Sequence, residues 1–303
     1  METAIHDEQG ERPVAGARPN ARPMATSARH AMSIDVEEFF QVWALRNHYA
    51  RSQWDDIPSR VVDSTGLLLD LMEATGTRAT FFTLGWVAER HPALIRRIVA
   101  EGHELASHGY DHQLVREMTE QAFREDLARS KALLEEAGGV EVTGYRAPNF
   151  SIDASTPWAY EALLDAGYRY SSSSHPVAND HYGDVRGERR PHRRDGIVEL
   201  PVTVLPLAGR NLPCAGGGYF RILPLAWTRF ALDRVAREPG ARTMFYLHPW
   251  EVDPAQPRPG RLGLSTRFRH YTRLSKCASM LKDLMQRFAW DRIDRVYADE
   301  LNP

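Results

Sequence analysis

Two histidines four residues apart stand in the segment Ser107-His108-Gly109-Tyr110-Asp111-His112, directly after an apolar run that predicts a β-strand. Side chains at positions i and i+4 of a helical turn lie on the same side, so both imidazoles could reach one metal ion. The pair alone is weak evidence in a chain with 12 histidines. Its place at a strand end strengthens the hypothesis, because α/β barrels build their active sites at the carboxyl ends of strands.

Three carboxylates, those of Asp35, Glu37 and Glu38, follow the apolar start of a second predicted strand. Acidic residues at a strand end can simply begin a helix, because they are stabilised near its positive N-terminal end. Alternatively, one carboxylate joins two histidines on a metal ion while another accepts a proton from water. The residues themselves leave both interpretations open.

Two further predicted strands end in an arginine and in a histidine. Arg146, in Thr143-Gly144-Tyr145-Arg146-Ala147-Pro148-Asn149-Phe150, could hold a carboxylate ionised through paired hydrogen bonds. An ordinary salt bridge is the alternative. His248 closes the apolar run that begins at Met244 and could act as a general acid, because the pKa of imidazole lies near neutral pH. A histidine buried in the core is the competing interpretation.

Short β-like runs alternate with amphipathic helical stretches along the chain, which is the pattern of an α/β domain with a parallel sheet. The predicted strands cover residues 31–36, 79–84, 104–107, 143–146, 168–171, 197–200 and 243–248. The predicted helices cover residues 60–74, 87–100, 120–137, 156–166, 225–237 and 273–287.

Composition restricts the class of protein. The chain has 303 residues, 43% of them hydrophobic, which is enough for a sizeable core, and its formal charge of -2 lacks the basicity of general nucleic-acid binders. Cys214 and Cys277 form no CxxC pair, so a thiolate zinc site and a disulfide framework are both excluded. No window is long and apolar enough to span a membrane. Residues 1–30 lack the apolar region of a secretory signal, and we predict a disordered leader there.

An arginine-rich cluster interrupts the alternating pattern in the second half of the chain. Its members are Arg186, Arg189, Arg190, Arg193 and Arg194. A solvated loop is the simpler interpretation, and contact with an anionic glycan or with phosphate is the alternative.

Taken together and in this order, the four strand ends resemble the polysaccharide deacetylase family, also called the NodB-homology or carbohydrate esterase family 4-like domain. The resemblance runs from about residue 32 to 299. It is narrowed to a branch associated with exopolysaccharide loci and exosortase (PEP-CTERM) systems by four motifs. These are Asp35-Val36-Glu37-Glu38-Phe39-Phe40-Gln41-Val42, Gly216-Gly217-Gly218-Tyr219-Phe220-Arg221, Tyr246-Leu247-His248-Pro249-Trp250-Glu251-Val252-Asp253-Pro254 and Arg269-His270-Tyr271-Thr272.

The resemblance implies an α/β fold, namely a distorted (β/α) barrel with about seven parallel strands. It further implies a barrel domain over residues 31–252 and a C-terminal extension over 253–303 that packs on the barrel. A divalent metal ion, usually Zn²⁺, is expected in the mouth of the barrel.

The family's functional roles transfer to this chain residue by residue. His108 and His112 resemble metal ligands, and Asp35 resembles the catalytic base. The family's usual third ligand is an aspartate beside the base, but Val36 stands there. Glu37 is the nearest carboxylate on the same side of the strand end, so it is assigned as the third metal ligand.

Three further catalytic roles follow from the same comparison, and a set of sugar contacts is predicted beside them. Arg146 resembles the residue that orients the base, and His248 resembles the general acid. The backbone N–H of Asn149 would contact the oxyanion, and Trp158, Trp250 and Tyr219 are predicted to contact the sugar. Core packing is an equal alternative for the two tryptophans.

One departure from the family pattern concerns the aspartate that usually holds the acid histidine. Serines fill its expected place between Tyr168 and Ser174, so Asp180 or Asp184 would have to hold His248.

The predicted function is metal-dependent hydrolysis of N-acetyl groups from amino-sugar residues of an exopolysaccharide or cell-surface glycan. The expected partner is therefore an N-acetylated polysaccharide, without nucleic acid, and the expected location is the cytoplasm, including the membrane periphery. Two alternatives remain: an amidohydrolase of the same fold acting on a small ureide-like molecule, and a glycan-binding module without turnover.

Overall fold

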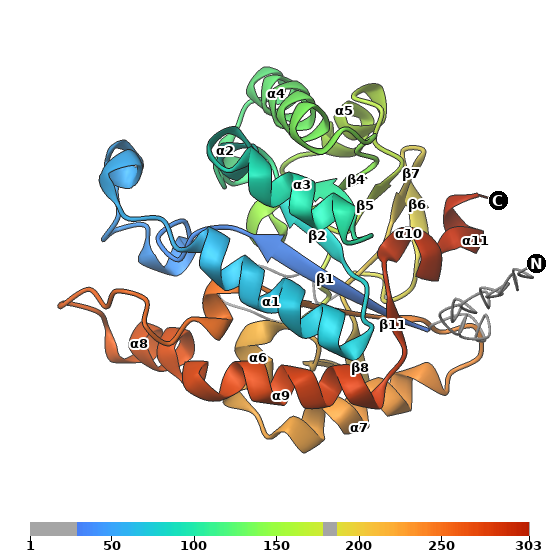
Figure 1. Cartoon of the computed structure of the whole chain (residues 1–303). Coiled ribbons are helices and arrows are strands. Elements are labelled where there is room, and N and C mark those ends of the chain that lie inside the picture. The colour runs from blue at the N-terminus through green and yellow to red at the C-terminus, as the bar shows by residue number, and fades with distance from the viewer. Residues whose placement is uncertain (1–28, 178–186, 303) are drawn as a thin grey trace, which may run out of the picture.

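A central, mostly parallel sheet organises the computed structural model, which describes residues 29–177 and 187–302. Its strands follow the order β10-β1-β2-β3-β4-β5-β7-β6 (Figure 1). These strands are β1 (His30–Val36), β2 (Thr80–Thr83), β3 (Glu104–Ser107), β4 (Gly144–Tyr145), β5 (Tyr170–Ser171), β6 (His192–Arg194), β7 (Ile197–Glu199) and β10 (Thr243–Leu247). The curled sheet with surrounding helices is a distorted (β/α) barrel, which confirms the predicted fold.

All seven predicted strands occur, and neighbouring ones pair in parallel. The prediction missed four short strands. β6 pairs antiparallel with β7, β8 (Val204–Leu207) and β9 (Arg210–Pro213) form a separate hairpin, and β11 (Trp290–Asp291) pairs with the start of β1. These strands have two to four residues, which is too short for a distinct apolar pattern.

The helices pack around the outside of the curled sheet. The longer ones are α1 (Val61–Thr75), α3 (Pro92–Ala100), α4 (Glu120–Gly138), α7 (Leu225–Ala236) and α9 (Leu274–Arg287). Shorter ones are α2 (Gly85–Arg90), α5 (Ala159–Asp165), α6 (Gly217–Ile222), α8 (Leu264–Tyr271), α10 (Ile293–Val296) and α11 (Ala298–Leu301). Among the described residues, no helix is long and apolar enough to cross a bilayer.

The single helix predicted over residues 87–100 is in fact two helices, so this prediction was wrong. α2 ends at Arg90 and α3 begins at Pro92. Proline disfavours helical dihedral angles in the residue before it, and His91 accordingly has φ -128° and ψ 54°. Proline suits the first position of the following helix because its missing N–H would have no partner there.

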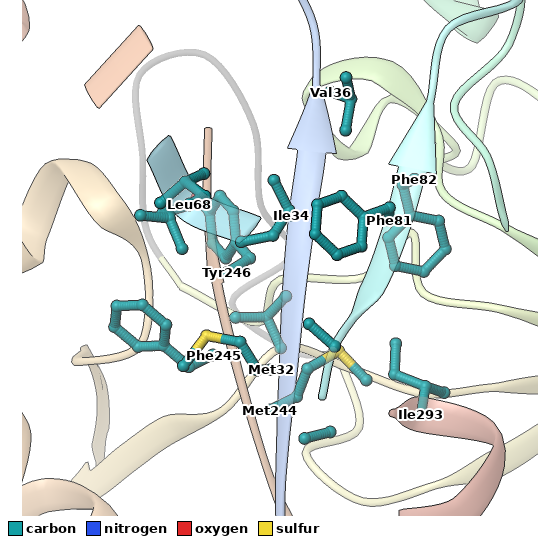
Figure 2. Packing of buried hydrophobic residues seen from close by; sticks show 14 of the residues in the cluster. Met32, Ile34, Val36, Leu68, Phe81, Phe82, Met244, Phe245, Tyr246 and Ile293 are labelled. Carbon is teal, nitrogen blue, oxygen red and sulfur yellow. The ribbon is translucent and has the colours of Figure 1, made fainter. Parts of the chain in front are cut away.

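The main hydrophobic core lies between the strands β1, β2 and β10 and the helices around them. Figure 2 shows Met32 and Ile34 of β1 between Phe81 of β2 and Phe245 of β10. Strands of a parallel sheet are covered on both faces, which explains why β1 is buried along nearly its whole length. A second apolar cluster lies under α4 and α5 and includes Phe123, Tyr145 and Leu163.

The C-terminal residues contact the first part of the chain. α9 lies beside α1, as Figure 1 shows, and β11 pairs with the beginning of β1. On the other edge of β1, five residues from His30 to Ile34 pair with β10. The N-terminal strand is thus held between segments that lie more than 200 residues away.

Replacing Phe245 by alanine should therefore destabilise the whole barrel. Phe245 is fully buried on β10, with its ring centroid 5.3 Å from that of Phe220 and 6.1 Å from that of Trp290. We expect a loss of about 3–5 kcal/mol in the free energy of unfolding, measured by urea denaturation, because the truncation leaves a cavity. The matched variant Phe230→Ala, at a residue 53% exposed, should change stability by less than about 0.5 kcal/mol.

Candidate metal and catalytic site

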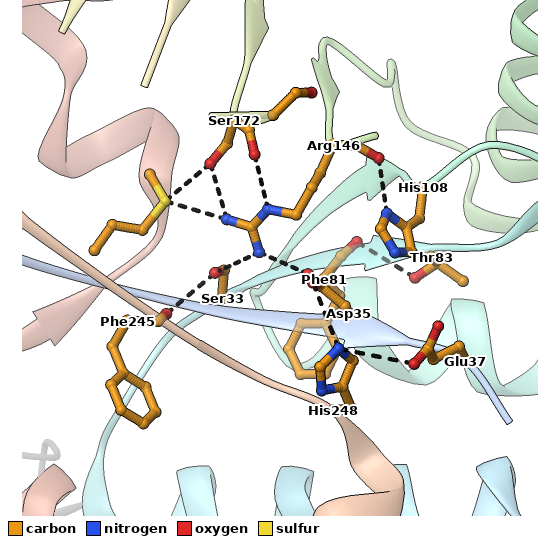
Figure 3. Close-up of polar contacts among 12 residues, drawn as sticks. Ser33, Asp35, Glu37, Phe81, Thr83, His108, Arg146, Ser172, Phe245 and His248 are labelled. Carbon is orange, nitrogen blue, oxygen red and sulfur yellow. Dashed lines mark hydrogen bonds and ion pairs between the residues drawn. The ribbon is translucent and has the colours of Figure 1, made fainter. Parts of the chain in front are cut away.

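The chemically active side chains converge at the carboxyl edge of the sheet. Asp35 is the second-last residue of β1 and Glu37 follows that strand, while His108 follows β3, Arg146 follows β4 and His248 follows β10 (Figure 3). Because these strands run parallel, their carboxyl ends open on one side of the barrel. A cavity of about 580 Å³ lies there, and its wall includes Asp35, His108 and His248.

Glu37, His108 and His112 form a compact group of candidate metal ligands. One potential ligand atom from each side chain lies within 4.8 Å of the others, and all three residues are buried. The histidines reach this position through a loop and not through the helical turn predicted from their spacing. Gly109 has φ +76° and His112 has φ +62°, left-handed values that turn the chain back toward His108.

The hydrogen bonding of His108 leaves one ring nitrogen for a metal. Its Nδ1 lies 2.7 Å from the carbonyl oxygen of Arg146, which can only accept, so Nδ1 carries the proton and Nε2 keeps its lone pair. Burial lowers the pKa of His108 to about 4. This imidazole is therefore neutral at physiological pH, as a metal ligand must be.

The contact between Glu37 and His112 also suits a shared cation. Glu37 Oε2 lies 2.8 Å from His112 Nε2, yet this buried oxygen has no partner in hydrogen-bond geometry among the described residues. Burial alone would raise the pKa of Glu37, but the nearby His112 and His248 outweigh it and lower the pKa to about 2. An ionised carboxylate with one unbonded oxygen facing two imidazoles fits a divalent ion.

Asp35 is held by the guanidinium of Arg146. Nη1 of Arg146 donates to Asp35 Oδ1 over 2.6 Å and also to the hydroxyl of Ser33 over 2.9 Å. The other carboxylate oxygen, Asp35 Oδ2, lies 3.9 Å from His248 Nε2. One oxygen of Asp35 is thus anchored while the other remains on the side of His248, as Figure 3 shows.

The serines that replace the expected aspartate after β5 serve the Arg146 segment. Ser172 accepts from Arg146 Nε through its carbonyl oxygen at 3.1 Å and from Nη2 through its hydroxyl at 2.9 Å. Ser173 accepts the backbone N–H of Ala147 at 2.9 Å. The serines therefore orient the arginine and leave His248 to another partner.

That partner is Glu251, a residue that sequence reasoning missed. His248 Nδ1 lies 2.8 Å from Glu251 Oε1, and the backbone N–H of His248 donates to the same oxygen at 3.1 Å. Glu251 in turn accepts from Arg221 Nε at 2.6 Å. The previously considered Asp180 and Asp184 lie outside the described residues. The sequence feature that points to this pairing is the three-residue separation of Glu251 from His248, which the turn Pro249–Val252 brings together.

The buried carboxylate of Glu251 and the imidazole of His248 shift each other's pKa. Burial alone would raise the pKa of Glu251, but Arg221 and His248 lower it to about 2. Burial alone would lower the pKa of His248, whereas Glu37, Glu251 and Asp35 raise it to about 9. His248 is thus held at one ring nitrogen by an ionised carboxylate and turns Nε2 toward Asp35 and Glu37.

The glycine triplet 216–218 makes room for this arrangement. A Cβ at Gly216 would lie 2.7 Å from the ring of Tyr246, and one at Gly217 would collide with the carboxylate of Glu251. A Cβ at Gly218 would meet no atom within 4 Å. Close packing therefore requires glycine at positions 216 and 217, whereas position 218 has room for a side chain.

Arg221 also connects the C-terminal end of α8 to the site through hydrogen bonds. Its guanidinium donates to the carbonyl oxygens of Arg269, His270 and Thr272 at 3.2, 2.9 and 2.8 Å. The motifs around Gly217, Glu251 and His270 thus meet at one buried arginine, although they are spread over more than fifty residues.

Trp250 and Tyr219 line the cavity, but Trp250 does not offer an open face to a sugar. Its ring stacks between those of His248 and His270, with centroid distances of 5.1 and 4.4 Å. Its indole N–H donates to Glu37 Oε1 at 3.1 Å. Trp250 therefore orients the candidate ligand Glu37 from one side of the cavity.

Trp158, the third predicted sugar contact, lies away from the cavity. This residue precedes α5 and packs against the second apolar cluster, with its ring centroid 5.4 Å from that of Phe123. It does not belong to the cavity wall. Core packing, the alternative interpretation of this tryptophan, describes its position.

Asn149 lines the cavity beside Ala147 and Phe150. Its backbone has φ +51°, a left-handed value that asparagine adopts more readily than most residues, and its Nδ2 is buried without a partner among the described residues. The predicted role of its backbone N–H at the oxyanion stays a prediction.

The structure is an α/β barrel whose strand ends bring two histidines and several carboxylates together at one cavity, where they form a candidate metal site. Residues 47–171 match the family model described as "Polysaccharide deacetylase", and residues 172–298 match the model described as "Domain of unknown function (DUF3473)". Residues 47–171 thus form a polysaccharide deacetylase region, which the DUF3473 region follows directly.

Relatives of the first part are deacetylases of glycans. The chain is 36% identical over 86 residues to the peptidoglycan-N-acetylglucosamine deacetylase PgdA of Listeria monocytogenes, covering 28% of this chain and 18% of the relative. It is 33% identical over 106 residues to the peptidoglycan deacetylase of Helicobacter pylori, covering 35% of each. It is 38% identical over 85 residues to the chitooligosaccharide deacetylase of a Bradyrhizobium species, covering 25% of this chain and 38% of the relative. The chain thus spans less than two fifths of the length of each of these relatives.

The fold also occurs in a solved structure of similar length. A Mycobacterium smegmatis protein classed as a polysaccharide deacetylase superposes with a TM-score of 0.59 at 22% identity, covering 95% of this chain and 96% of that one. At this identity the similarity establishes the shared fold.

Replacing His108 by alanine should remove the bound metal. We expect the purified chain to hold about one divalent ion, measured by elemental analysis after dialysis, and the variant to hold at least about tenfold less, because one of three ligands is lost. His192→Ala, on strand β6 away from the cavity, is the matched control and should retain the ion. Equal metal content in the His108 variant would exclude this ligand group.

Replacing Gly217 by alanine should disturb Glu251. The added methyl group collides with the Glu251 carboxylate, so we expect a loss of about 1–3 kcal/mol in unfolding free energy from overpacking. Gly218→Ala is one position away and meets open space, so it should be neutral or slightly stabilising, because alanine favours helices. Urea denaturation of both variants measures the difference, and equal stability would contradict the packing argument.

Proposed function

We propose that this chain is a metal-dependent deacetylase that hydrolyses N-acetyl groups on amino-sugar residues of an exopolysaccharide or cell-surface glycan. The supporting observation is the meeting of three functional units in one cavity. These are the ligand group around His108, the anchored carboxylate of Asp35, and the histidine–glutamate pair of His248 and Glu251. Amide hydrolysis needs an activated water, a base and an acid, and each unit suits one of these tasks.

A divalent ion such as Zn²⁺, held by His108, His112 and Glu37, would supply the Lewis acid that makes water acidic near neutral pH. The protein's own groups do the rest. Asp35 Oδ2 accepts the proton of the attacking water, since Arg146 occupies only Oδ1. The acetyl carbonyl oxygen gains negative charge, and in this proposal the N–H of Asn149 stabilises it.

His248 completes the reaction by donating a proton from Nε2 to the amine nitrogen as the C–N bond breaks. Its Nδ1 stays bonded to Glu251, which holds the ring in one orientation and stabilises the cationic form. Acetate and a free amino group on the sugar are the products. The amine then becomes protonated and gives the polymer a new positive charge.

The size of the cavity also favours a substrate larger than a small molecule. Its wall includes α6 residues such as Tyr219 and α8 residues such as Thr266, which lie beyond the catalytic group. A cavity of about 580 Å³ has more room than a small ureide fills and can hold a segment of a sugar polymer. The exopolysaccharide association and the cytoplasmic location stay predictions from the sequence.

The variant Asp35→Asn tests the catalytic proposal. Its amide cannot accept the proton of water, so acetate release from N-acetylated oligosaccharides should fall about 10²- to 10⁴-fold, with metal content and glycan binding unchanged. Enzymatic measurement of acetate and elemental analysis give the two readouts. Glycan binding without acetate release by the unmodified chain would favour a binding module, and hydrolysis of an allantoin-like ureide instead of the glycans would favour the small-molecule amidohydrolase.

A further inference from the structure

A protruding segment beside the cavity carries an unusual combination of side chains. It comprises residues 254–263 and helix α8, and we refer to residues 254–271 as the α8 lip. Ser265, Thr266 and Arg269 of α8 form part of the cavity wall. The lip therefore combines a cavity-facing side with a side that is exposed to solvent.

The solvent side of the lip carries two strongly exposed hydrophobic side chains. Leu264 is 86% exposed and Phe268 is 58% exposed, the two highest values among the large hydrophobic side chains that the structure describes. They stand four residues apart on α8 and so lie on one side of the helix. Ser265 and Arg269, also four residues apart, lie on a neighbouring side and line the cavity.

The lip is also positively charged. Residues 254–282 contain no aspartate or glutamate, whereas Arg258, Arg261 and Arg267 are exposed on or beside α8. The guanidinium of Arg258 lies over the ring of Tyr271, 4.9 Å from its centroid. Burial raises the pKa of Tyr271, and the nearby charges of Arg258 and Arg267 partly oppose this rise. Cations thus flank the side of the helix that carries Leu264.

An anionic polysaccharide and an apolar protein groove would each complement only part of this surface. An anionic polysaccharide would pair with the arginines but leave Leu264 and Phe268 in water. An apolar protein groove would bury the two hydrophobic residues but leave three cations without counter-charges. The interface of a bilayer with anionic lipids offers both environments, because phosphates lie next to the acyl chains there.

We propose that the α8 lip binds the surface of a bilayer that contains anionic phospholipids. Leu264 and Phe268 insert at the boundary between headgroups and acyl chains, and Arg258, Arg261 and Arg267 contact lipid phosphates. Because α8 also forms part of the cavity wall, binding places the mouth of the cavity at the membrane surface.

The test measures co-sedimentation of the full chain with vesicles of phosphatidylcholine alone and of phosphatidylcholine mixed with phosphatidylglycerol. We expect binding to the anionic vesicles only, weakened by salt because the charges are exposed. The triple variant Arg258→Gln, Arg261→Gln, Arg267→Gln should bind about 100-fold less, from about fivefold per arginine. Leu264→Ser with Phe268→Ser should bind at least about tenfold less.

Matched controls change the same residue types elsewhere on the surface. Phe230→Ser alters an exposed phenylalanine on α7, and Arg96→Gln, Arg210→Gln, Arg237→Gln removes three exposed arginines outside the α8 lip. Both controls should bind vesicles like the unmodified chain. All these side chains are exposed, so every variant should keep its unfolding free energy.

Several outcomes would overturn the proposal. They are equal binding to neutral and anionic vesicles, unchanged binding of both lip variants, and an equal loss in the controls. Binding of the lip to polygalacturonate but not to anionic vesicles would assign the surface to a glycan instead. The vesicle measurement requires no catalysis, so it is independent of the proposed deacetylation, and acetate release from a short soluble oligosaccharide should be unchanged in the lip variants.

Discussion

The buried guanidinium of Arg146 is the interaction on which the site depends. A cation without access to water is stable only when its donors are satisfied, and each of its five N–H groups has a partner here. The partners are Asp35 and Ser33 of β1, the carbonyl and hydroxyl oxygens of Ser172 after β5, and the sulfur of Met244 on β10. One side chain therefore joins three strands, and Asp35 is at once a counter-ion and the candidate base.

The two regions recognised by family models form one structural unit. The sheet runs without interruption from β2, β3 and β4 of the first region to β7 and β10 of the second, and β1 precedes both regions and pairs with β2 and β10. The candidate ligands His108 and His112 lie in the first region, whereas His248 and Glu251 lie in the second. Asp35 and Glu37 lie in neither, so the cavity exists only when all three parts fold together.

The sequence predicted the main strands well because strands covered on both faces are continuous apolar runs. It also pointed to His108, His112, Asp35 and His248, which the structure brings to one cavity, because each follows such a run. Other features depend on the path of loops and on contacts distant in sequence. The pairing of Glu251 with His248 needs a turn and an arginine thirty residues away, and the three-residue separation of the pair is not enough to predict it.

The space at Gly217 has an evolutionary consequence. Because the Glu251 carboxylate occupies the position of the missing side chain, the two residues constrain each other's identity. A larger residue at 217 is tolerated only if the acid at 251 shortens or moves, and such a move would release both His248 and Arg221. We therefore expect strong epistasis between these positions, and their joint variation among homologues should mark lineages in which the histidine is held in another way.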